Sequence, residues 1–101
     1  MEALPPESGS IKFDGRVFAR SLLREPGVYR MLGTGESVLY VGKARDLRAR
    51  VESYFSRDIE DPRIATMLRQ VRRMEVIVTR TEAEALLLEI QLIKALRPRY
   101  N

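Results

Sequence analysis

The sequence predicts a small α/β fold, in which helices flank a three-stranded sheet made of a hairpin plus a third strand. Two apolar runs, residues 28–32 and 38–41, surround a Gly-Thr-Gly-Glu-Ser segment that has the composition of a hairpin turn. Residues 75–79 alternate between apolar and polar side chains and predict the third strand. Three strands cannot bury both of their faces alone, so helices must cover the sheet.

The helices before and after the hairpin have recognisable boundaries. A helix is expected over residues 14–25, because apolar side chains recur at helical spacing and Pro26 follows. Asp46 is a suitable N-cap for the next helix. The inward stripe predicted for that helix consists of Leu47, Val51, Tyr54 and Phe55.

Two further helices are indicated by their N-terminal residues. Asp61 and Pro62 suit the N-cap and first helical positions of a third helix. The side chains expected to point inward from it are Ile64, Met67, Leu68, Val71 and Met74. Thr81 and Glu84 have the spacing of a capping box, which predicts a last helix that ends near Leu96.

The hairpin places two tyrosines close together. A four-residue loop, residues 33–36, would pair Leu32 with Ser37 and therefore Tyr29 with Tyr40, so that both phenols share a sheet face. The chain has no His and no Cys, which removes the commonest general base and the commonest soft metal ligands. The phenols are therefore candidate proton acceptors, although Tyr is also a frequent packing residue in strands.

The charge distribution favours an anionic partner. The 101 residues suit a single domain and carry a net charge of +4, from 18 basic and 14 acidic side chains. One basic cluster surrounds a single acid, Asp46, and consists of Lys43, Arg45, Arg48 and Arg50. Others are Arg69, Arg72 and Arg73, and then Lys94, Arg97 and Arg99 near the end of the sequence. This composition is compatible with nucleic-acid binding but does not itself indicate a nuclease.

Composition also bears on location. No uninterrupted apolar stretch approaches membrane-spanning length, and the polar start of the sequence lacks the pattern of a secretory signal. We expect residues 1–13 to form a flexible arm and residues 14–101 to form the domain. The absence of Cys fits a reducing cytoplasm.

Glu89 occupies an unusual position for a carboxylate. On a helical wheel it lies within the apolar stripe of the last helix, whose predicted members are Ala85, Leu86, Leu92, Ile93 and Leu96. A carboxylate that faces a core needs an ion-pair partner or a metal ion. The wheel leaves two interpretations open, a buried ion pair with an arginine such as Arg50 or a metal ligand.

Two triplets, Gly27-Val28-Tyr29 and Tyr40-Val41-Gly42, resemble the signature of the GIY-YIG nucleases, with Val in place of Ile. Other segments fall where that family has them: Lys43-Ala44 directly after the second triplet, Arg50, the acidic and apolar run 82–89, and the ending Arg-Pro-Arg-Tyr-Asn, residues 97–101. The resemblance covers about residues 14–101 and is closest to the nuclease domains that act in bacterial nucleotide excision repair. It implies a fold of the GIY-YIG type.

The resemblance also implies roles for individual residues. Glu89 matches the ligand of the catalytic divalent cation, Mg²⁺ or Mn²⁺, and Arg50 matches the catalytic arginine. Tyr40 and Tyr29 match active-site tyrosines; we favour Tyr40 as the base and Tyr29 as an orienting residue, beside Gly42. The remaining matches are Lys43, a phosphate or water contact, and Asn101, which closes the site in the family.

The expected function is metal-dependent hydrolysis of a DNA phosphodiester bond, by resemblance the incision on the 3′ side of a lesion. Lys43, Arg45, Arg48 and Arg50 are the expected DNA contacts, although solvated surface positions are an equally good interpretation of Arg45 and Arg48. The resemblance implies UvrB as a partner, through segments that this sequence lacks, and we expect the fragment to be a monomer. The alternatives are a non-catalytic nucleic-acid-binding module and a GIY-YIG enzyme of another role, such as a homing or restriction nuclease.

Overall fold

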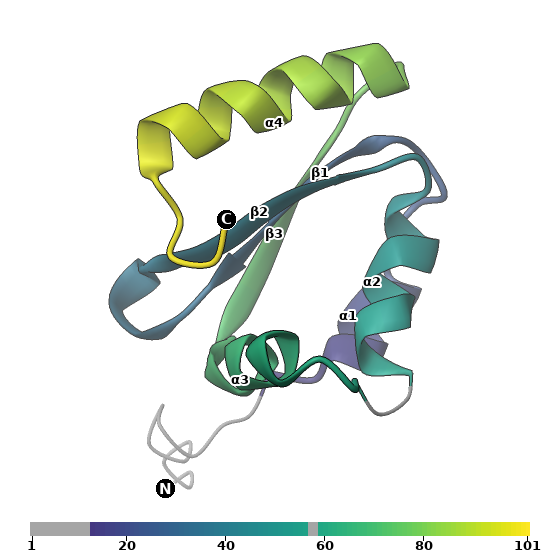
Figure 1. The fold of residues 1–101 in the computed structure, drawn as a ribbon. Coiled ribbons are helices and arrows are strands. Elements are labelled where there is room, and N and C mark those ends of the chain that lie inside the picture. Colours follow the sequence, from purple (N-terminus) through teal and green to yellow (C-terminus); the bar gives the residue numbers. More distant parts are fainter. Residues whose placement is uncertain (1–12, 57–58) are drawn as a thin grey trace, which may run out of the picture.

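A computed structural model describes residues 13–56 and 59–101 (Figure 1). In chain order its elements are α1 (Gly15–Arg20), β1 (Gly27–Leu32), β2 (Val38–Ala44), α2 (Leu47–Phe55), α3 (Pro62–Gln70), β3 (Arg73–Val78) and α4 (Glu82–Leu96). The strands form one antiparallel sheet in the order β2-β1-β3. The predicted α/β architecture, a hairpin plus a third strand between helices, is therefore confirmed. Of the arm expected over residues 1–13, only Phe13 belongs to the described residues, and it packs against Phe18 and Phe55.

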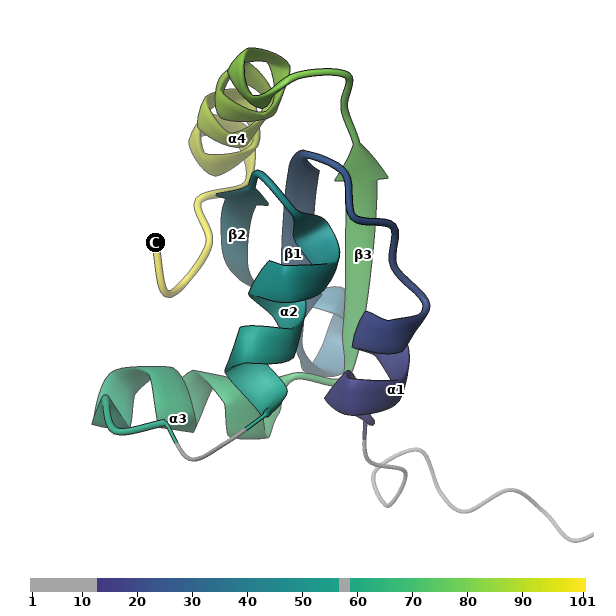
Figure 2. The same cartoon turned by 90° about the vertical axis from the view of Figure 1, so that its right-hand side faces the viewer.

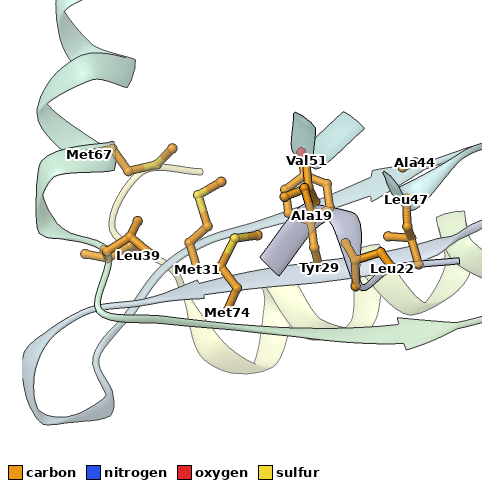
Figure 3. Packing of buried hydrophobic residues seen from close by; sticks show 11 residues of the cluster. Ala19, Leu22, Tyr29, Met31, Leu39, Ala44, Leu47, Val51, Met67 and Met74 are labelled. Carbon is orange, nitrogen blue, oxygen red and sulfur yellow. The ribbon is translucent and has the colours of Figure 1, made fainter. Parts of the chain in front are cut away.

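The helices divide between the two faces of the sheet. Figures 1 and 2 show α4 on one face and α1, α2 and α3 on the other. The larger core cluster lies on the three-helix face, where Tyr29, Met31, Leu47 and Val51 are buried together (Figure 3). On the α4 face, a smaller cluster centres on Val28, Val41 and Ala85. The sheet thus separates two apolar layers, and β2 forms one of its edges.

The predicted helix caps are confirmed. The side chain of Asp46 accepts a hydrogen bond from the amide of Ala49, and that of Asp61 accepts one from Arg63. Thr81 accepts a hydrogen bond from the amide of Glu84 at 3.1 Å. These contacts depend only on local sequence, which is why the capping residues were sufficient to locate the helix starts.

Two predicted helix ends are wrong. The helix expected over residues 14–25 ends at Arg20, and Ser21 caps it, so Leu22 reaches the core from the following turn. The third helix ends at Gln70 because Val71 takes an extended conformation. Val71 and Met74 are buried as expected, but they lie beyond the helix. Their apolar side chains correctly predicted burial, but they do not belong to the helix.

The predicted hairpin register is also wrong. Tyr29 lies opposite Gly42, and Tyr40 lies opposite Met31. The turn contains a short 3-10 helix, Thr34–Glu36, and Leu32 pairs with Val38 instead of Ser37, which moves the pairing by one residue. An irregularity between Met31 and Leu32 moves it by one more, so that the total shift along the strands is two. A shift of two residues keeps every side chain on its predicted face, so the two phenols still share one.

The apolar stripe of α4 has a different phase from the one predicted. Leu86 is 43% exposed, whereas Leu88 packs onto the smaller cluster with Leu92 and Ile93. Glu89 is consequently half-buried at the border of the contact surface rather than inside a core. No helix within the described residues is long and apolar enough to cross a membrane.

Candidate active site

Three phenols gather on the three-helix face of the sheet. The rings of Tyr29 and Tyr40 have their centroids 6.1 Å apart, and Tyr54 of α2 packs edge-on against Tyr29 at 5.9 Å. The hydroxyls of Tyr29 and Tyr54 share a hydrogen bond of 2.8 Å. Tyr29 is only 1% exposed, while Tyr40 and Tyr54 are half-buried. We call Tyr29, Tyr40 and Tyr54 the tyrosine cluster.

Tyr54 is the member of the cluster that sequence reasoning missed. It was placed correctly on the inward stripe of α2 but was interpreted as a helix residue without a role of its own. The available signal was its position, because a phenol on the same stripe as Leu47 and Val51 faces the sheet face that carries Tyr29 and Tyr40.

Gly42 is required by the packing of Tyr29. A Cβ atom at position 42 would lie 2.4 Å from both Cζ and the hydroxyl oxygen of Tyr29. Real Cβ atoms do not approach other atoms so closely, so a side chain here would displace the phenol. The glycine of the second triplet therefore makes space for the tyrosine of the first.

The environment raises the pKa of two phenols. Burial is the largest cause for Tyr29, whose pKa lies far above the ordinary value, and Tyr54 adds to the effect. The pKa of Tyr40 is raised by burial, by Tyr54 and by the Glu89 carboxylate, while Arg50 acts in the opposite direction. The positive charge of Arg50 alone would lower the pKa of Tyr40, but the causes that raise it outweigh this effect.

Glu89 comes close enough to Tyr40 for its charge to affect that phenol. Within residues 13–56 and 59–101, no ion pair includes Glu89 or Arg50, so the alternative of an ion pair between them is not formed there. The same part of the chain has no group of three or more His, Cys, Asp or Glu side chains that could hold a metal ion. Glu89 is thus a single carboxylate beside the tyrosine cluster.

The basic residues near the cluster differ in their surroundings. Arg50 lines a cleft of about 570 Å³ at the start of α2, together with Ala44 and Ser53. Lys43 is exposed near the end of β2. Arg45 pairs with Glu82 at 3.4 Å, and Arg48 pairs with Glu52 of the same helix at 3.4 Å. Exposed pairs of this kind are weak and do not prevent contact with phosphate.

Asn101 is held against β2. Its Oδ1 accepts a hydrogen bond from the amide of Val41, and its Nδ2 donates one to the carbonyl of Val41, both at 2.8 Å. The amide of Tyr100 likewise donates to the carbonyl of Leu39 at 2.8 Å. The segment after α4 therefore follows the outer edge of β2 (Figure 2). Asn101 binds Val41, the residue that precedes Gly42 in the strand.

The family model described as the UvrC-like GIY-YIG domain matches residues 25–101. UvrABC system protein C of Aromatoleum aromaticum is 60% identical over 89 residues, which make up 88% of this chain and 15% of that protein. The protein of the same name from Xanthomonas campestris pv. campestris is 61% identical over 89 residues, or 88% of this chain and 14% of its own length. This chain belongs to the UvrC-like GIY-YIG domain family, and it spans about 15% of the length of such relatives.

A solved structure resembles the whole fold. The crystal structure of the GIY-YIG N-terminal endonuclease domain of UvrC from Thermotoga maritima, bound to its catalytic divalent cation, magnesium, is 35% identical with a TM-score of 0.78. The match covers 90% of this chain and 99% of that one. Variants of the Thermotoga domain in which a tyrosine is replaced by Phe, or an asparagine by Ala, are also bound to the catalytic divalent cation.

Proposed function

We propose that this chain is a divalent-metal-dependent DNA endonuclease domain that hydrolyses a phosphodiester bond. The observation that carries the proposal is the meeting of the tyrosine cluster with the Glu89 carboxylate and the Arg50 guanidinium at one site. This arrangement combines a candidate proton acceptor, a candidate metal ligand and a fixed positive charge. The likeness to the magnesium-bound endonuclease domain from Thermotoga supports it.

The residues at the site fit a magnesium or manganese ion. Glu89 offers carboxylate oxygens, is half-buried and has no ion pair within the described residues. Mg²⁺ is commonly held by one or two carboxylates and completes its shell with water and substrate phosphate. When bound, the cation supplies positive charge for the leaving oxygen and offsets the Glu89 charge that raises the Tyr40 pKa.

The phenols divide the work by their exposure. Tyr40 is half-buried and lies within reach of the charges of Glu89 and Arg50. Its phenolate oxygen, formed once the hydroxyl proton has left to solvent, accepts a proton from the attacking water. Tyr29 is buried, with a pKa raised further by burial, and it orients the cluster through its hydrogen bond with Tyr54. Arg50 and Lys43 stabilise the negative charge that develops on the phosphoryl group.

The wider role follows from the curated relatives. Their name, UvrABC system protein C, supports incision of damaged DNA in nucleotide excision repair, and we assign this domain the cut on the 3′ side of the lesion. We further propose UvrB as the partner and the bacterial cytoplasm as the location. The relatives are several times longer than this chain, and we assign the contact with UvrB to other parts of such a protein.

Cleavage of supercoiled plasmid tests the proposed activity. The wild-type chain is expected to nick the plasmid only when Mg²⁺ or Mn²⁺ is present, and Glu89→Gln is expected to bind DNA without nicking it. Glu52→Gln, which changes a carboxylate on α2, on the other face of the sheet from α4 (Figures 1 and 2), is the matched control and should retain activity. A chain that binds DNA but gains no cleavage over a metal titration would instead be a non-catalytic binding module.

A further inference from the structure

A second basic site lies at the turn end of the hairpin, apart from the tyrosine cluster. It is a pocket of about 290 Å³ between the hairpin turn, the end of α3 and the segment after α4. Its polar side chains come from Thr34, Ser37, Arg69, Gln70, Arg72 and Arg99, and no Asp or Glu lines it. We call Arg69, Arg72 and Arg99 the arginine pocket.

The three guanidinium charges of the arginine pocket are not neutralised within the described residues. No ion pair there includes any of the three. Arg69 donates a hydrogen bond to the hydroxyl of Thr66 at 3.1 Å, and Arg72 donates to the carbonyl of Arg69 at 3.3 Å. Each guanidinium therefore keeps further N–H donors available for an anion.

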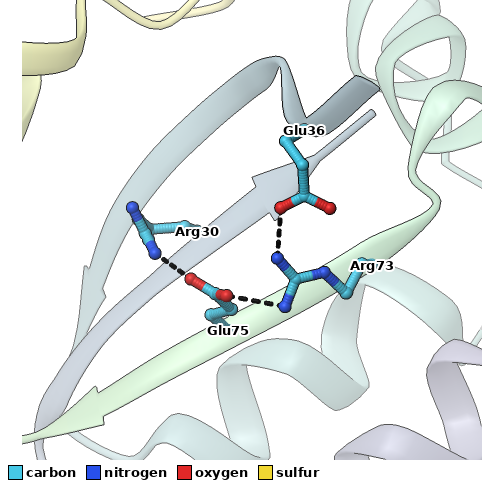
Figure 4. A network of polar contacts seen from close by, with 4 residues as sticks. All are labelled: Arg30, Glu36, Arg73 and Glu75. Atoms are coloured by element: carbon cyan, nitrogen blue, oxygen red, sulfur yellow. Dashed lines mark hydrogen bonds and ion pairs between the residues drawn. The ribbon is translucent and has the colours of Figure 1, made fainter. Parts of the chain in front are cut away.

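The neighbouring Arg73 shows the opposite arrangement. It pairs with Glu36 and, at 2.6 Å, with Glu75, which also binds Arg30 (Figure 4). Two carboxylates thus balance the two arginines of this network. The sequence alone places Arg69, Arg72 and Arg73 in one cluster, but the structure separates Arg73 from the two arginines that remain available.

The arginine pocket is held in place by the segment after α4. The amide of Arg99 donates to the carbonyl of Val38 at 3.3 Å. Gln70 of α3 donates to the hydroxyl of Tyr100 at 2.7 Å, which ties this segment to the helix that carries Arg69. These cross-links fix the relative positions of the three backbone segments that carry the arginines, which lowers the entropic cost of binding.

The same segment connects the pocket to the tyrosine cluster. Its contacts begin at Val38 and end at Val41, next to Gly42. Val38 and Val41 are three residues apart, which corresponds to roughly 10 Å of strand at about 3.3 Å per residue. Measured along the helix axis of duplex DNA, that length corresponds to about three nucleotides of one strand at about 3.4 Å each.

We propose that the arginine pocket is a second phosphate-binding subsite, which holds the DNA backbone about three nucleotides, measured along the duplex axis, from the bond that is cut. The proposal rests on the proposed DNA endonuclease function for its ligand. Bidentate contacts from arginine suit phosphate oxygens and fix the register of the duplex without reading its sequence. This subsite would orient the substrate along the edge of β2 so that the cleaved phosphate meets Arg50 and Glu89.

The salt dependence of DNA binding tests the subsite. Binding of a labelled duplex is measured over a range of salt concentrations, with EDTA present to prevent cleavage. The double variant Arg69→Gln/Arg72→Gln is expected to lower the magnitude of the slope of log K against log [salt] by about one to two. Arg69→Lys/Arg72→Lys preserves the charge and should keep most of the slope, which separates lost charge from altered structure.

A matched control removes the same charge elsewhere. Arg80→Gln/Lys94→Gln changes two exposed basic residues that do not line the pocket and should change the slope much less. Equal slopes for the wild type and Arg69→Gln/Arg72→Gln, or equal losses in the two Gln double variants, would overturn the proposal. The proposal would also be overturned if the pocket bound inorganic phosphate but not DNA. In that case phosphate would raise the melting temperature of the wild type and not of Arg69→Gln/Arg72→Gln, while the two proteins would have the same slope.

Metal-dependent nicking by the wild type is measured separately. If nicking is present and the slope is unchanged, the subsite is wrong while the nuclease function stands. If nicking is absent and the slope falls only in Arg69→Gln/Arg72→Gln, the subsite stands as a DNA-binding feature while the nuclease function is wrong.

Discussion

At the scale of single residues, exposure separates three otherwise similar phenols. Tyr29 is buried and shares its hydroxyl hydrogen bond with Tyr54, so water cannot reach it directly. Tyr40 is half-buried and is affected by the charges of both Glu89 and Arg50. A proton acceptor must contact the attacking water, which favours Tyr40 for that role and leaves Tyr29 to position the cluster.

Tyr40→Phe should impair catalysis much more than stability. The ring that packs against Tyr29 is retained, so the free energy of unfolding should change by about 1 kcal/mol or less. Loss of a general base typically lowers the rate by roughly a hundred- to ten-thousand-fold. Single-turnover cleavage by the wild type should rise with pH, and this rise should be missing from the variant. A variant with a near-normal rate and an unchanged pH profile would show that Tyr40 only packs.

The raised pKa of Tyr29 predicts loss of stability at high pH. Below the ordinary pKa of 10.0 the Tyr29 phenol is protonated in both the folded and the unfolded state, so it adds no pH dependence to the free energy of unfolding. Above 10.0 the unfolded chain loses this proton while the folded chain keeps it, so the folded state becomes less favoured as pH rises. Urea unfolding of Tyr29→Phe should therefore show a shallower decline above that pH than the wild type. Parallel declines would contradict the burial argument.

Sequence reasoning at the residue scale succeeded where identity alone was informative. It placed Tyr29 and Tyr40 on one face and singled out Glu89 on the last helix. It gave Tyr54 no role because the inward stripe of α2 shows only that this side chain faces the sheet, whereas its hydrogen bond with Tyr29 depends on how α2 packs there. It overestimated the burial of Glu89 because the phase of α4 depends on which side chains the sheet accepts.

At the scale of elements, the hairpin shows how local irregularities can alter pairing without moving a side chain to the other face of the sheet. The helix starts were predictable because Asp46, Asp61 and Thr81 bond to amides only two or three residues away. The register was not, because the turn contains positive φ angles at Gly35 and Glu36 and a pairing irregularity lies before it, between Met31 and Leu32. The observed register puts Gly42 opposite Tyr29, which explains why a glycine stands there.

Gly42→Ala tests this explanation of the hairpin. The added methyl group would overlap the Tyr29 phenol and should destabilise the domain by about 1–3 kcal/mol while also lowering activity. Gly35→Ala is the control, because its φ of 68° makes Ala strained but no atom lies within 4 Å of the new Cβ. It should cost about 1–2 kcal/mol and spare the activity of the folded fraction. Equal loss of activity in both variants, compared at equal folded fraction, would refute the packing role.

At the scale of the whole molecule, the ion pairs distinguish arginines that carboxylates neutralise from arginines that remain available, a distinction that clusters in the sequence do not show. Arg30 and Arg73 are balanced by carboxylates on the α4 face, whereas Arg69, Arg72 and Arg99 remain available at the turn end of the hairpin. The segment after α4 joins that end to the tyrosine cluster along β2. A net charge of +4 predicted an anionic partner, but only the fold shows which basic residues can meet it.

The central claim is that Glu89 holds the divalent cation beside the tyrosine cluster. Calorimetric titration with Mn²⁺ tests it without depending on cleavage or on partner proteins. The wild type should bind one ion, Tyr40→Phe should retain that binding, and Glu89→Gln should lose it while remaining folded by circular dichroism. Retained Mn²⁺ binding in a folded Glu89→Gln variant would contradict the account.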